Sequence, residues 1–197
     1  MGVTPASSTA PHFSDDFEAL LKALRAFRPR PEIESEEIPA PAKLAKHGFA
    51  LTAECFDGEL EIANGRFVLL YEPKGQETWG GELRAVTFIK ADVEQEMGSD
   101  PLLPEVGWSW FEESLSTINA SHLSGTVTLA LSSSFGELSD RPAQSELEIR
   151  ASWTLHAKDV NEVLDHLESW MDLLAHCAGL TPLSQGDGVA TMVRRSK

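Results

Sequence analysis

The residues best suited to metal chemistry lie along one side of the last predicted helix. Asp165, Glu168, Asp172 and His176 follow one another at intervals of three, four and four residues, which places them on one helix face. Carboxylate oxygens and an imidazole nitrogen in such a row can converge on a divalent cation. The same row is also the ordinary solvent-facing side of an amphipathic helix, which needs no ligand. We therefore predict no metal site.

Other groups with catalytic potential do not form a recognisable set. Glu112 and Glu113 are neighbours on a predicted helix and point apart, which makes them poor acid–base partners. Ser132, Ser133 and Ser134 have no histidine and acid placed beside them by the sequence. The chain also has no phosphate-binding glycine loop, no GxSxG elbow, no HExxH pair and no CxxC pair. We predict no catalytic residues and no cofactor.

An enzyme remains an alternative if distant residues meet in the fold. Glu54, Glu148, Arg150 and His156 lie on predicted strands or at their ends, where side chains from several strands can gather. A deep pocket that holds a carboxylate or histidine with a displaced pKa would favour this alternative. A smooth sheet face would count against it. The two cysteines fall in apolar periodic segments, which predicts buried, unreactive thiols.

The five tryptophans divide into a core set and a surface set. Trp108, Trp153 and Trp170 fit the apolar stripes of predicted helices and strands. Trp79 lies in a predicted loop, and Trp110 lies roughly 120° from the centre of the stripe on its helix. Tryptophan is enriched at protein interfaces, so Trp79 and Trp110 are candidates for an interaction surface. Alternatively, the loop and the helix edge fold back and bury these two rings.

A second candidate interaction surface is the acidic segment that follows the first helix. Residues 30–44 carry three prolines and four glutamates, Glu32, Glu34, Glu36 and Glu37, which predicts an extended connector. The glutamates are most simply a solvated face, and a binding strip for a basic partner is the alternative. The formal net charge of the chain is −15, which opposes direct binding to nucleic acid or to an anionic membrane.

Helices and strands predicted from the hydrophobic pattern must position these residues. Ser14 is a predicted helix cap, and the apolar stripe that follows it predicts a helix, which Pro29 ends. Asn64-Gly65 predicts a hairpin turn. Alternating or continuous apolar residues predict strands over 49–55, 60–62, 67–71, 83–91, 123–132 and 146–153.

Two further helices are predicted after these first strands. Residues 100–111 contain two prolines, a glycine and three aromatic residues, and Pro104 suits the first turn of a helix. The last helix begins at a capping box in which Asp159 is the cap and Glu162 its partner. Gly179 supplies the C-terminal cap of that helix.

The predicted order is helix, three or four strands, helix, two strands, helix, with no internal repeat. Segregated helices and strands predict an α+β fold, an antiparallel β-sheet with helices packed on one face. We expect a disordered N-terminal tail over 1–13, a single domain over 14–182 and a flexible C-terminal tail over 183–197. No membrane span or signal peptide is evident, so we expect a cytoplasmic protein.

This order of elements resembles the type III secretion chaperone-like fold, which YbjN-type bacterial proteins share. Several stretches also resemble an actinobacterial family of uncharacterised proteins, known as domain of unknown function 3000. These stretches are Pro31 to Glu34, Ile38 to Pro41, Leu51 to Glu54, Gly65 to Leu70, Gly75 to Glu77, Asp100 to Trp110 and Glu146 to Trp153. The second resemblance implies a bacterial cytosolic protein often encoded beside a ribonuclease D-like exonuclease. It implies no catalytic residues, because the family has none assigned.

Together, these patterns predict a non-enzymatic protein-binding role, chaperone-like or adaptor-like. The partner would be a basic protein that meets the acidic segment, or the ribonuclease D-like exonuclease that the family resemblance implies. A homodimer would use the same surfaces. An accessory role in RNA metabolism through that exonuclease is one alternative, and an enzyme is the other. We expect no direct binding to nucleic acid.

Overall fold

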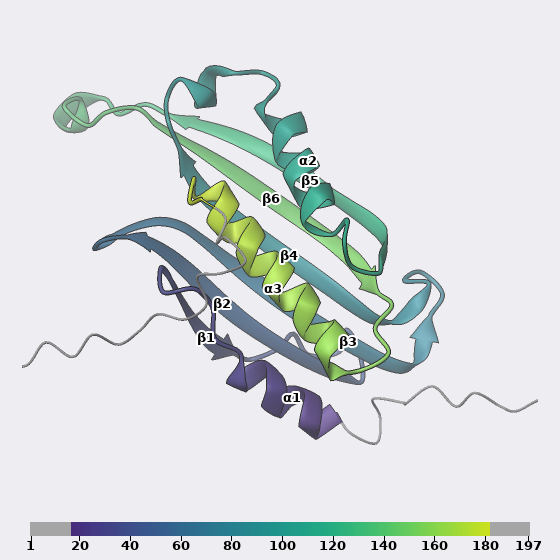
Figure 1. The fold of residues 1–197 in the computed structure, drawn as a ribbon. Coiled ribbons are helices and arrows are strands. Elements are labelled where there is room, and N and C mark those ends of the chain that lie inside the picture. Colours follow the sequence, from purple (N-terminus) through teal and green to yellow (C-terminus); the bar gives the residue numbers. More distant parts are fainter. Residues whose placement is uncertain (1–16, 182–197) are drawn as a thin grey trace, which may run out of the picture.

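A computed structural model describes residues 17–181, which form one six-stranded antiparallel sheet with three α-helices (Figure 1). The strands are β1 (Ile33–Ile38), β2 (His47–Asp57), β3 (Leu60–Gln76), β4 (Gly81–Val93), β5 (Ala120–Ser132) and β6 (Gln144–Leu155). The α-helices are α1 (Phe17–Ala26), α2 (Leu103–Ser114) and α3 (Val160–Cys177), and two 3-10 helices are η2 (Met97–Ser99) and η3 (Gly136–Leu138). The predicted α+β fold is confirmed, with four strands before the middle helix and two after it.

The sheet is covered by helices on one face only. Its strand order is β1-β2-β3-β4-β6-β5, because the chain passes through α2 after β4 and returns as the β5–β6 hairpin. α3 crosses the middle of the sheet, with α2 on the β5 side and α1 on the β1 side (Figure 1). We call this side the covered face. The opposite side is the uncovered face, because none of the described helices lies on it.

The main core fills the space between the covered face and the helices. Trp153 of β6 and Trp170 of α3 are each 1% exposed, which confirms their predicted place in the core. The Trp153 indole N–H donates to His166 Nδ1 at 3.1 Å, and the Trp170 indole N–H donates to the Thr87 hydroxyl. Both bonds matter, because a buried donor without a partner costs about 1–3 kcal/mol.

Most signals predicted for the ends of the last two helices are confirmed, but Glu162 accepts from the Lys158 N–H and not from that of Asp159. Pro104 lies in the first turn of α2. The Asp159 carboxylate caps α3 by accepting bonds from the backbone N–H groups of Asn161 and Glu162. Gly179 follows α3 with a φ of 75°, in the left-handed region that glycine adopts without strain.

The hairpin turn predicted at Asn64-Gly65 is wrong. Both residues lie inside β3 and pair with β2 on one side and β4 on the other. The turn between β2 and β3 lies instead at Gly58, whose φ is 65°. A Cβ atom at Gly65 would lie 2.9 Å from the Phe88 carbonyl oxygen and 2.9 Å from Cζ2 of Trp170. Gly65 therefore lets α3 pack closely on the sheet, because a glycine in a strand leaves room for another element to approach the backbone.

The extended connector predicted over residues 30–44 contains a strand. β1 pairs with β2 at the sheet edge, and Ile33 is buried in the main core. Ala40 and Ala45 then lie over the uncovered face, where they pack against the same buried residues as Trp79. The second apolar cluster that results consists of Ala50, Val68 and Leu70 with Ile38, Ala40, Ala45 and Trp79. This cluster covers the β2–β3 part of the uncovered face.

Three predictions concern residues that the structure does not describe. The N-terminal tail over 1–13, the C-terminal tail over 183–197 and the cap at Ser14 all lie outside residues 17–181. Within residues 17–181, no helix has both the length and the apolar character needed to cross a membrane.

Candidate binding site on the uncovered face

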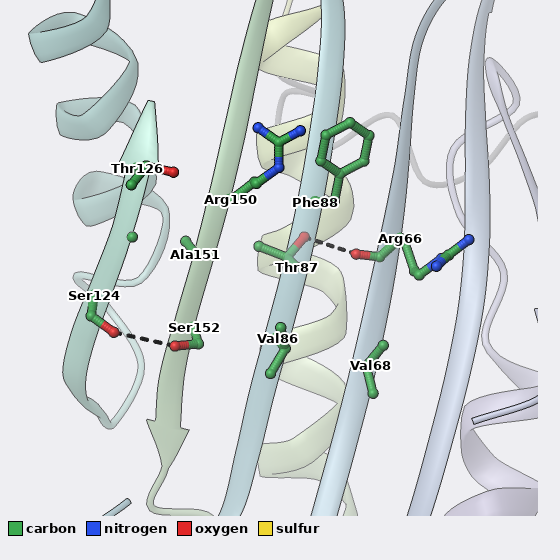
Figure 2. A pocket seen from close by; sticks show the side chains of 11 residues that line it. Arg66, Val68, Val86, Thr87, Phe88, Ser124, Thr126, Arg150, Ala151 and Ser152 are labelled. Atoms are coloured by element: carbon green, nitrogen blue, oxygen red, sulfur yellow. Dashed lines mark hydrogen bonds between the residues drawn. The ribbon is translucent and has the colours of Figure 1, made fainter. Parts of the chain in front are cut away.

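A hollow of about 470 Å³ lies on the uncovered face, over strands β3, β4, β6 and β5 (Figure 2). This volume falls within the range of small binding sites, although the hollow is shallow and open to solvent. Val68, Val86 and Phe88 give it an apolar floor. In Figure 2, α3 lies behind the strands, so the hollow and the helices occupy opposite faces of the sheet.

Strand pairing explains which side chains meet in the hollow. Arg66 of β3 pairs with Phe88 of β4, and Phe88 pairs with Arg150 of β6, which in turn pairs with Thr126 of β5. Side chains that are neighbours in such a row start about 5 Å apart. The next row on the same face consists of Val68, Val86, Ser152 and Ser124. Two rows therefore bring two arginines, an aromatic ring, apolar side chains and three hydroxyls together.

The hollow is positively charged although the chain is strongly acidic. None of its 11 lining residues is Asp or Glu, in a chain with 31 acidic residues. The Arg150 guanidinium lies 5.0 Å from the centroid of the Phe88 ring, and its Nη1 lies 2.7 Å from a Glu148 carboxylate oxygen. The Arg66 side chain extends toward β2 and has no ion-pair partner among the described residues (Figure 2). Its charge is available to a ligand.

A buried arginine adjoins one end of the hollow and has no carboxylate partner within residues 17–181. Arg84 is 8% exposed, and its Nη2 donates to Ser152 Oγ at 2.6 Å and to Ser124 Oγ at 3.3 Å. Its Nη1 donates to Thr154 Oγ1 and to the His122 carbonyl oxygen, both at 2.9 Å. Burial lowers the pKa of Arg84, but arginine stays protonated in proteins. A buried charge whose only partners are neutral oxygens is costly, so this one requires an explanation.

The backbone of β5 is strained where it meets Arg84. The pairing of β5 with β6 shifts at an irregularity between Ser121 and Ser124, and His122 has a φ of 52°. This left-handed conformation is uncommon outside glycine and costs of order 1–3 kcal/mol. Gly80 makes room for the His122 ring, since a Cβ there would lie 2.5 Å from the ring's Cε1. The strain lets the His122 carbonyl accept from Arg84 beside the hollow.

Ser121 lies between two histidines, outside the hollow. Its hydroxyl is 2.6 Å from His156 Nε2 and 2.9 Å from His122 Nδ1. A serine bonded to an imidazole is half of a nucleophile–base arrangement, which also needs an acid to orient the base. Among residues 17–181, no carboxylate forms an ion pair with either ring. None of these three residues lines the hollow, and among residues 17–181 the cluster has no acid paired with either ring.

Comparison with known families places the chain without assigning it an activity. The model of a family described as protein of unknown function (DUF3000) matches residues 13–189. The chain belongs to this family. No curated protein and no solved structure matches it. The predicted resemblance to an uncharacterised family is confirmed, and the function of this DUF3000 protein must be argued from its own residues.

The two tryptophans predicted as an interaction surface lie on opposite faces of the sheet. Trp79 packs in the second apolar cluster on the uncovered face, and its carbonyl oxygen accepts a bond from Thr154. Trp110 is half-buried against the main core between α2 and α3, and its ring centroid lies 4.8 Å from that of His176. The two rings therefore do not form one surface, and each has packing partners within the chain. A contact with a partner stays a prediction for each.

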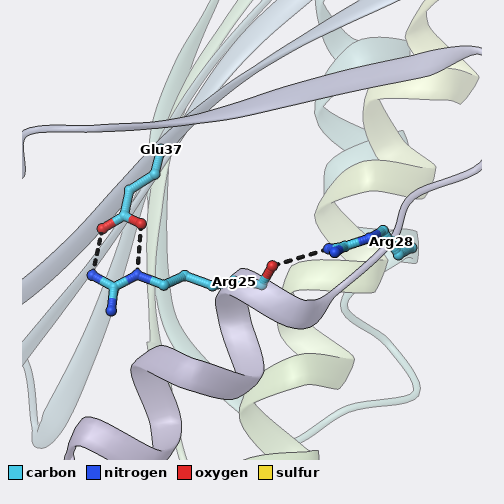
Figure 3. A network of polar contacts seen from close by, with 3 residues as sticks. All are labelled: Arg25, Arg28 and Glu37. Atoms are coloured by element: carbon cyan, nitrogen blue, oxygen red, sulfur yellow. Dashed lines mark hydrogen bonds and ion pairs between the residues drawn. The ribbon is translucent and has the colours of Figure 1, made fainter.

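The four glutamates of the acidic segment are divided as well, because side chains alternate along a strand. Glu37 points to the covered face, where Arg25 of α1 donates to both of its carboxylate oxygens, at 2.7 and 2.8 Å (Figure 3). Glu32, just before β1, pairs with a neighbouring arginine at 3.0 Å. Glu34 and Glu36 are exposed on the uncovered face. Only these two share a face with the hollow.

The residues of the alternative enzyme site do not converge. Glu54 and Glu148 share a row of the uncovered face, but β3 and β4 separate them. Three strand spacings put their backbones about 14 Å apart. His156 lies beyond the end of β6 and bonds to Ser121. Of these four residues, only Arg150 lines the hollow.

Of the residues that line the hollow, the sequence named only Arg150 as a site residue, in the alternative enzyme site, and it did not name Arg66, Phe88 or the adjoining Arg84. The signal that could have identified them is the alternation in β4, where Arg84, Val86 and Phe88 lie opposite the buried Leu83 and Ala85. An arginine, a valine and a phenylalanine on the same strand face predict a surface that is neither core nor ordinary solvent face. The sequence does not say that helices leave this face uncovered.

The metal-binding types predicted on α3, the two cysteines and His166 do not line the hollow. Within the described residues, no group of three or more His, Cys, Asp or Glu could hold a metal ion. The row of metal-binding types on α3 is exposed to solvent: Asp165, Glu168, Asp172 and His176. Burial raises the pKa of the Cys177 thiol to about 12 and lowers the pKa of the His166 imidazole to about 4. Both belong to the main core, as does the buried Cys55.

Proposed function

We propose that this DUF3000 protein is a non-enzymatic binding protein that holds an acidic, partly apolar segment of a partner protein in the hollow. The observation that carries the proposal is two exposed arginines in the row of Phe88, Arg150 over its ring and Arg66 on the neighbouring strand, on a sheet face without a described helix. Arginine and aromatic side chains supply much of the binding energy of protein interfaces. An apolar floor with a charged rim is the usual anatomy of such a surface.

The distribution of charge favours a ligand with few, localised negative charges. Arg66 and Arg150 line the hollow, whereas Glu54 and Glu148 lie in the adjoining row of the same face. A long polyanion such as RNA would extend over these glutamates and be repelled, as it would by the net charge of −15. A segment with one or two acidic side chains beside an apolar one avoids this repulsion.

The proposed partner segment is acidic, in contrast to the basic partner that the acidic segment predicted. Glu32 and Glu37 are already paired with arginines of the same chain, so they offer little free charge to a basic ligand. Arg66 is unpaired within the described residues, and Arg150 can exchange Glu148 for another carboxylate. The positive charge of the two arginines, and not the negative charge of Glu32 and Glu37, therefore remains available to bind a partner.

The lining of the hollow supports binding in preference to acid–base catalysis. Its residues are arginine, serine, threonine, glycine and apolar types, with no Asp, Glu, His, Lys or Cys among them. General acid–base catalysis uses a group that gains and loses a proton near the working pH. Arginine does not do so, and an isolated hydroxyl does not either. The hollow can orient an anion but has no group suited to removing a proton.

The proposal is tested with short capped synthetic peptides that carry glutamate on both sides of a leucine or phenylalanine. Binding is measured by fluorescence anisotropy, with matched peptides in which glutamine or lysine replaces glutamate, and with a single-stranded RNA. The glutamate peptide should bind best. The double variant Arg66→Glu/Arg150→Glu should weaken its binding at least roughly tenfold, because it removes charge-assisted hydrogen bonds.

A matched control is Arg141→Glu, an exposed arginine in the β5–β6 loop, which should leave binding unchanged. Two results would contradict the proposal. One is equal binding of the glutamate peptide by the native chain and the double variant. The other is tighter binding of the lysine peptide or of RNA than of the glutamate peptide.

A further inference from the structure

Two serine hydroxyls meet on the wall of the hollow that β5 and β6 form (Figure 2). Ser124 Oγ and Ser152 Oγ are 3.2 Å apart, and either hydroxyl can donate to the other. Both oxygens also accept from the buried guanidinium of Arg84. The pair also keeps a proton that no acceptor among the described residues takes, and it can donate that proton to a ligand in the hollow.

The number of hydrogen-bond donors and acceptors around the two serines shows that one proton is left to donate. Arginine has donors only, so Arg84 cannot accept a bond from either serine. The two hydroxyls carry two protons, and at most one of them is used between the serines. The other has no bond to an acceptor of the described residues. A hydroxyl donor at the hollow whose oxygen already accepts from a cation favours an acceptor on the ligand.

The charge of Arg84 strengthens the prediction. Donation from a cation polarises a hydroxyl and makes its own O–H a better donor, since hydrogen bonds in a chain reinforce one another. An anion bound to the serines would also give the buried charge of Arg84 the negative partner that it lacks among the described residues. The strained carbonyl of His122 fixes the guanidinium in place for this contact.

We infer that Ser124 and Ser152, held and polarised by Arg84, form the point at which the hollow binds a side-chain carboxylate of the acidic segment. Val86 and Phe88, in the same two rows of the sheet, receive the adjacent apolar side chain. The inference rests on the proposed function and names its recognition chemistry. The site favours glutamate or aspartate over the amides, because a carboxylate accepts from the free hydroxyl proton and also supplies the negative charge that Arg84 lacks within residues 17–181, whereas an amide is neutral.

The experiment measures the preference for the glutamate peptide over its glutamine analogue, as a ratio of dissociation constants. The native chain should prefer glutamate by roughly tenfold, as expected for a charge-assisted hydrogen bond. In the double variant Ser124→Ala/Ser152→Ala this ratio should fall clearly below that of the native chain, and the preference that remains should be the part that Arg66 and Arg150 supply. Ser152→Thr keeps a hydroxyl and suits a strand, so it should retain most of the preference.

The control is Ser132→Ala, an exposed serine of β5 outside the hollow, which should leave the ratio unchanged. Thermal unfolding of each variant separates recognition from folding. A purely structural role for the serines would lower stability while leaving the glutamate preference intact, and that result would overturn the inference. Serine-dependent binding of a phosphoserine peptide more tightly than the glutamate peptide would overturn the assignment to a carboxylate.

The outcomes also separate the inference from the proposed function. Suppose that Arg66→Glu/Arg150→Glu abolishes binding while the serine double variant keeps the glutamate preference. The hollow is then the binding site, but the two serines do not bind the carboxylate. If the arginine variant binds normally, the proposed function itself fails.

Discussion

The two faces of the sheet differ in the hydrogen-bond partners of their buried polar groups. On the covered face, the indole N–H groups of Trp153 and Trp170 each bond to a neutral acceptor inside the main core. On the uncovered face, the positive charge of Arg84 is buried among neutral oxygens, and His122 has a left-handed backbone conformation. The first arrangement stabilises the fold, whereas the second reduces its stability.

This difference indicates where selection has favoured something other than stability. Strained residues and unpaired buried charges persist only where the surrounding structure holds them, and they concentrate near functional sites. Here both occur at one end of a hollow that also contains Arg66 and Phe88. We expect substitutions on the covered face to change stability and those on the uncovered face to change binding.

The largest expected effect is the loss of Trp170 from the covered face. Trp170→Ala should lower the free energy of unfolding by about 3–5 kcal/mol, because it leaves a cavity in the core. The matched variant on the uncovered face, Phe88→Ala, should lower it by about 1 kcal/mol or less. Urea denaturation followed by circular dichroism measures both. Similar losses in the two variants would mean that the two faces contribute equally to the core.

A second difference concerns pH, because the covered face keeps His166 neutral. Burial lowers the pKa of His166 from 6.5 to about 4. Between these two pKa values His166 is protonated in the unfolded chain and neutral in the folded chain. The free energy of unfolding therefore falls as the pH drops from about 6.5 to about 4. The difference in pKa corresponds to about 3 kcal/mol over that window.

The variant His166→Asn tests this cause, since its amide oxygen lies near the position of Nδ1 and can still accept the Trp153 indole proton. Urea denaturation at a series of pH values should show a weaker pH dependence in the variant than in the native chain between pH about 6.5 and about 4. Above this window, the two stability curves should run parallel. Equal slopes throughout would show that burial of His166 does not contribute to acid sensitivity.

The covered face could largely be predicted from the sequence, because its signals are local and periodic. The stripe of α3, its cap at Asp159 and the alternation of β6 each need only a short stretch of chain to be recognised. The side chains of Trp153 and Trp170 fall on those stripes, so their burial follows from the same pattern.

The uncovered face could not be predicted, because its residues are gathered by pairing between distant strands. Arg66 and Arg150 are far apart in sequence and lie in one row of the sheet only because β4 lies between β3 and β6. Arg84 resembles an ordinary strand arginine until the bulge at His122 gives it a carbonyl partner. No spacing rule along the chain carries this information.

Gly65 gives the last and smallest of the tests, because it distinguishes a turn glycine from a packing glycine. Where space is open, replacing glycine by alanine often stabilises a protein slightly. A Cβ at Gly65 would instead come within 2.9 Å of both Trp170 and the Phe88 carbonyl oxygen, so Gly65→Ala should cost about 1–3 kcal/mol. The control Asn64→Ala, on the uncovered face beside it, should change stability by about 0.5 kcal/mol or less.

A double-mutant cycle makes the Gly65 test specific to the covered face. In Trp170→Phe the Cζ2 atom that blocks a Cβ at Gly65 is removed, so Gly65→Ala should cost less in that background than in the native chain. The coupling is measured by urea denaturation of the four proteins. If the cost is the same in both backgrounds, Trp170 does not impose the glycine, and the close approach of α3 to β3 is not the reason for it.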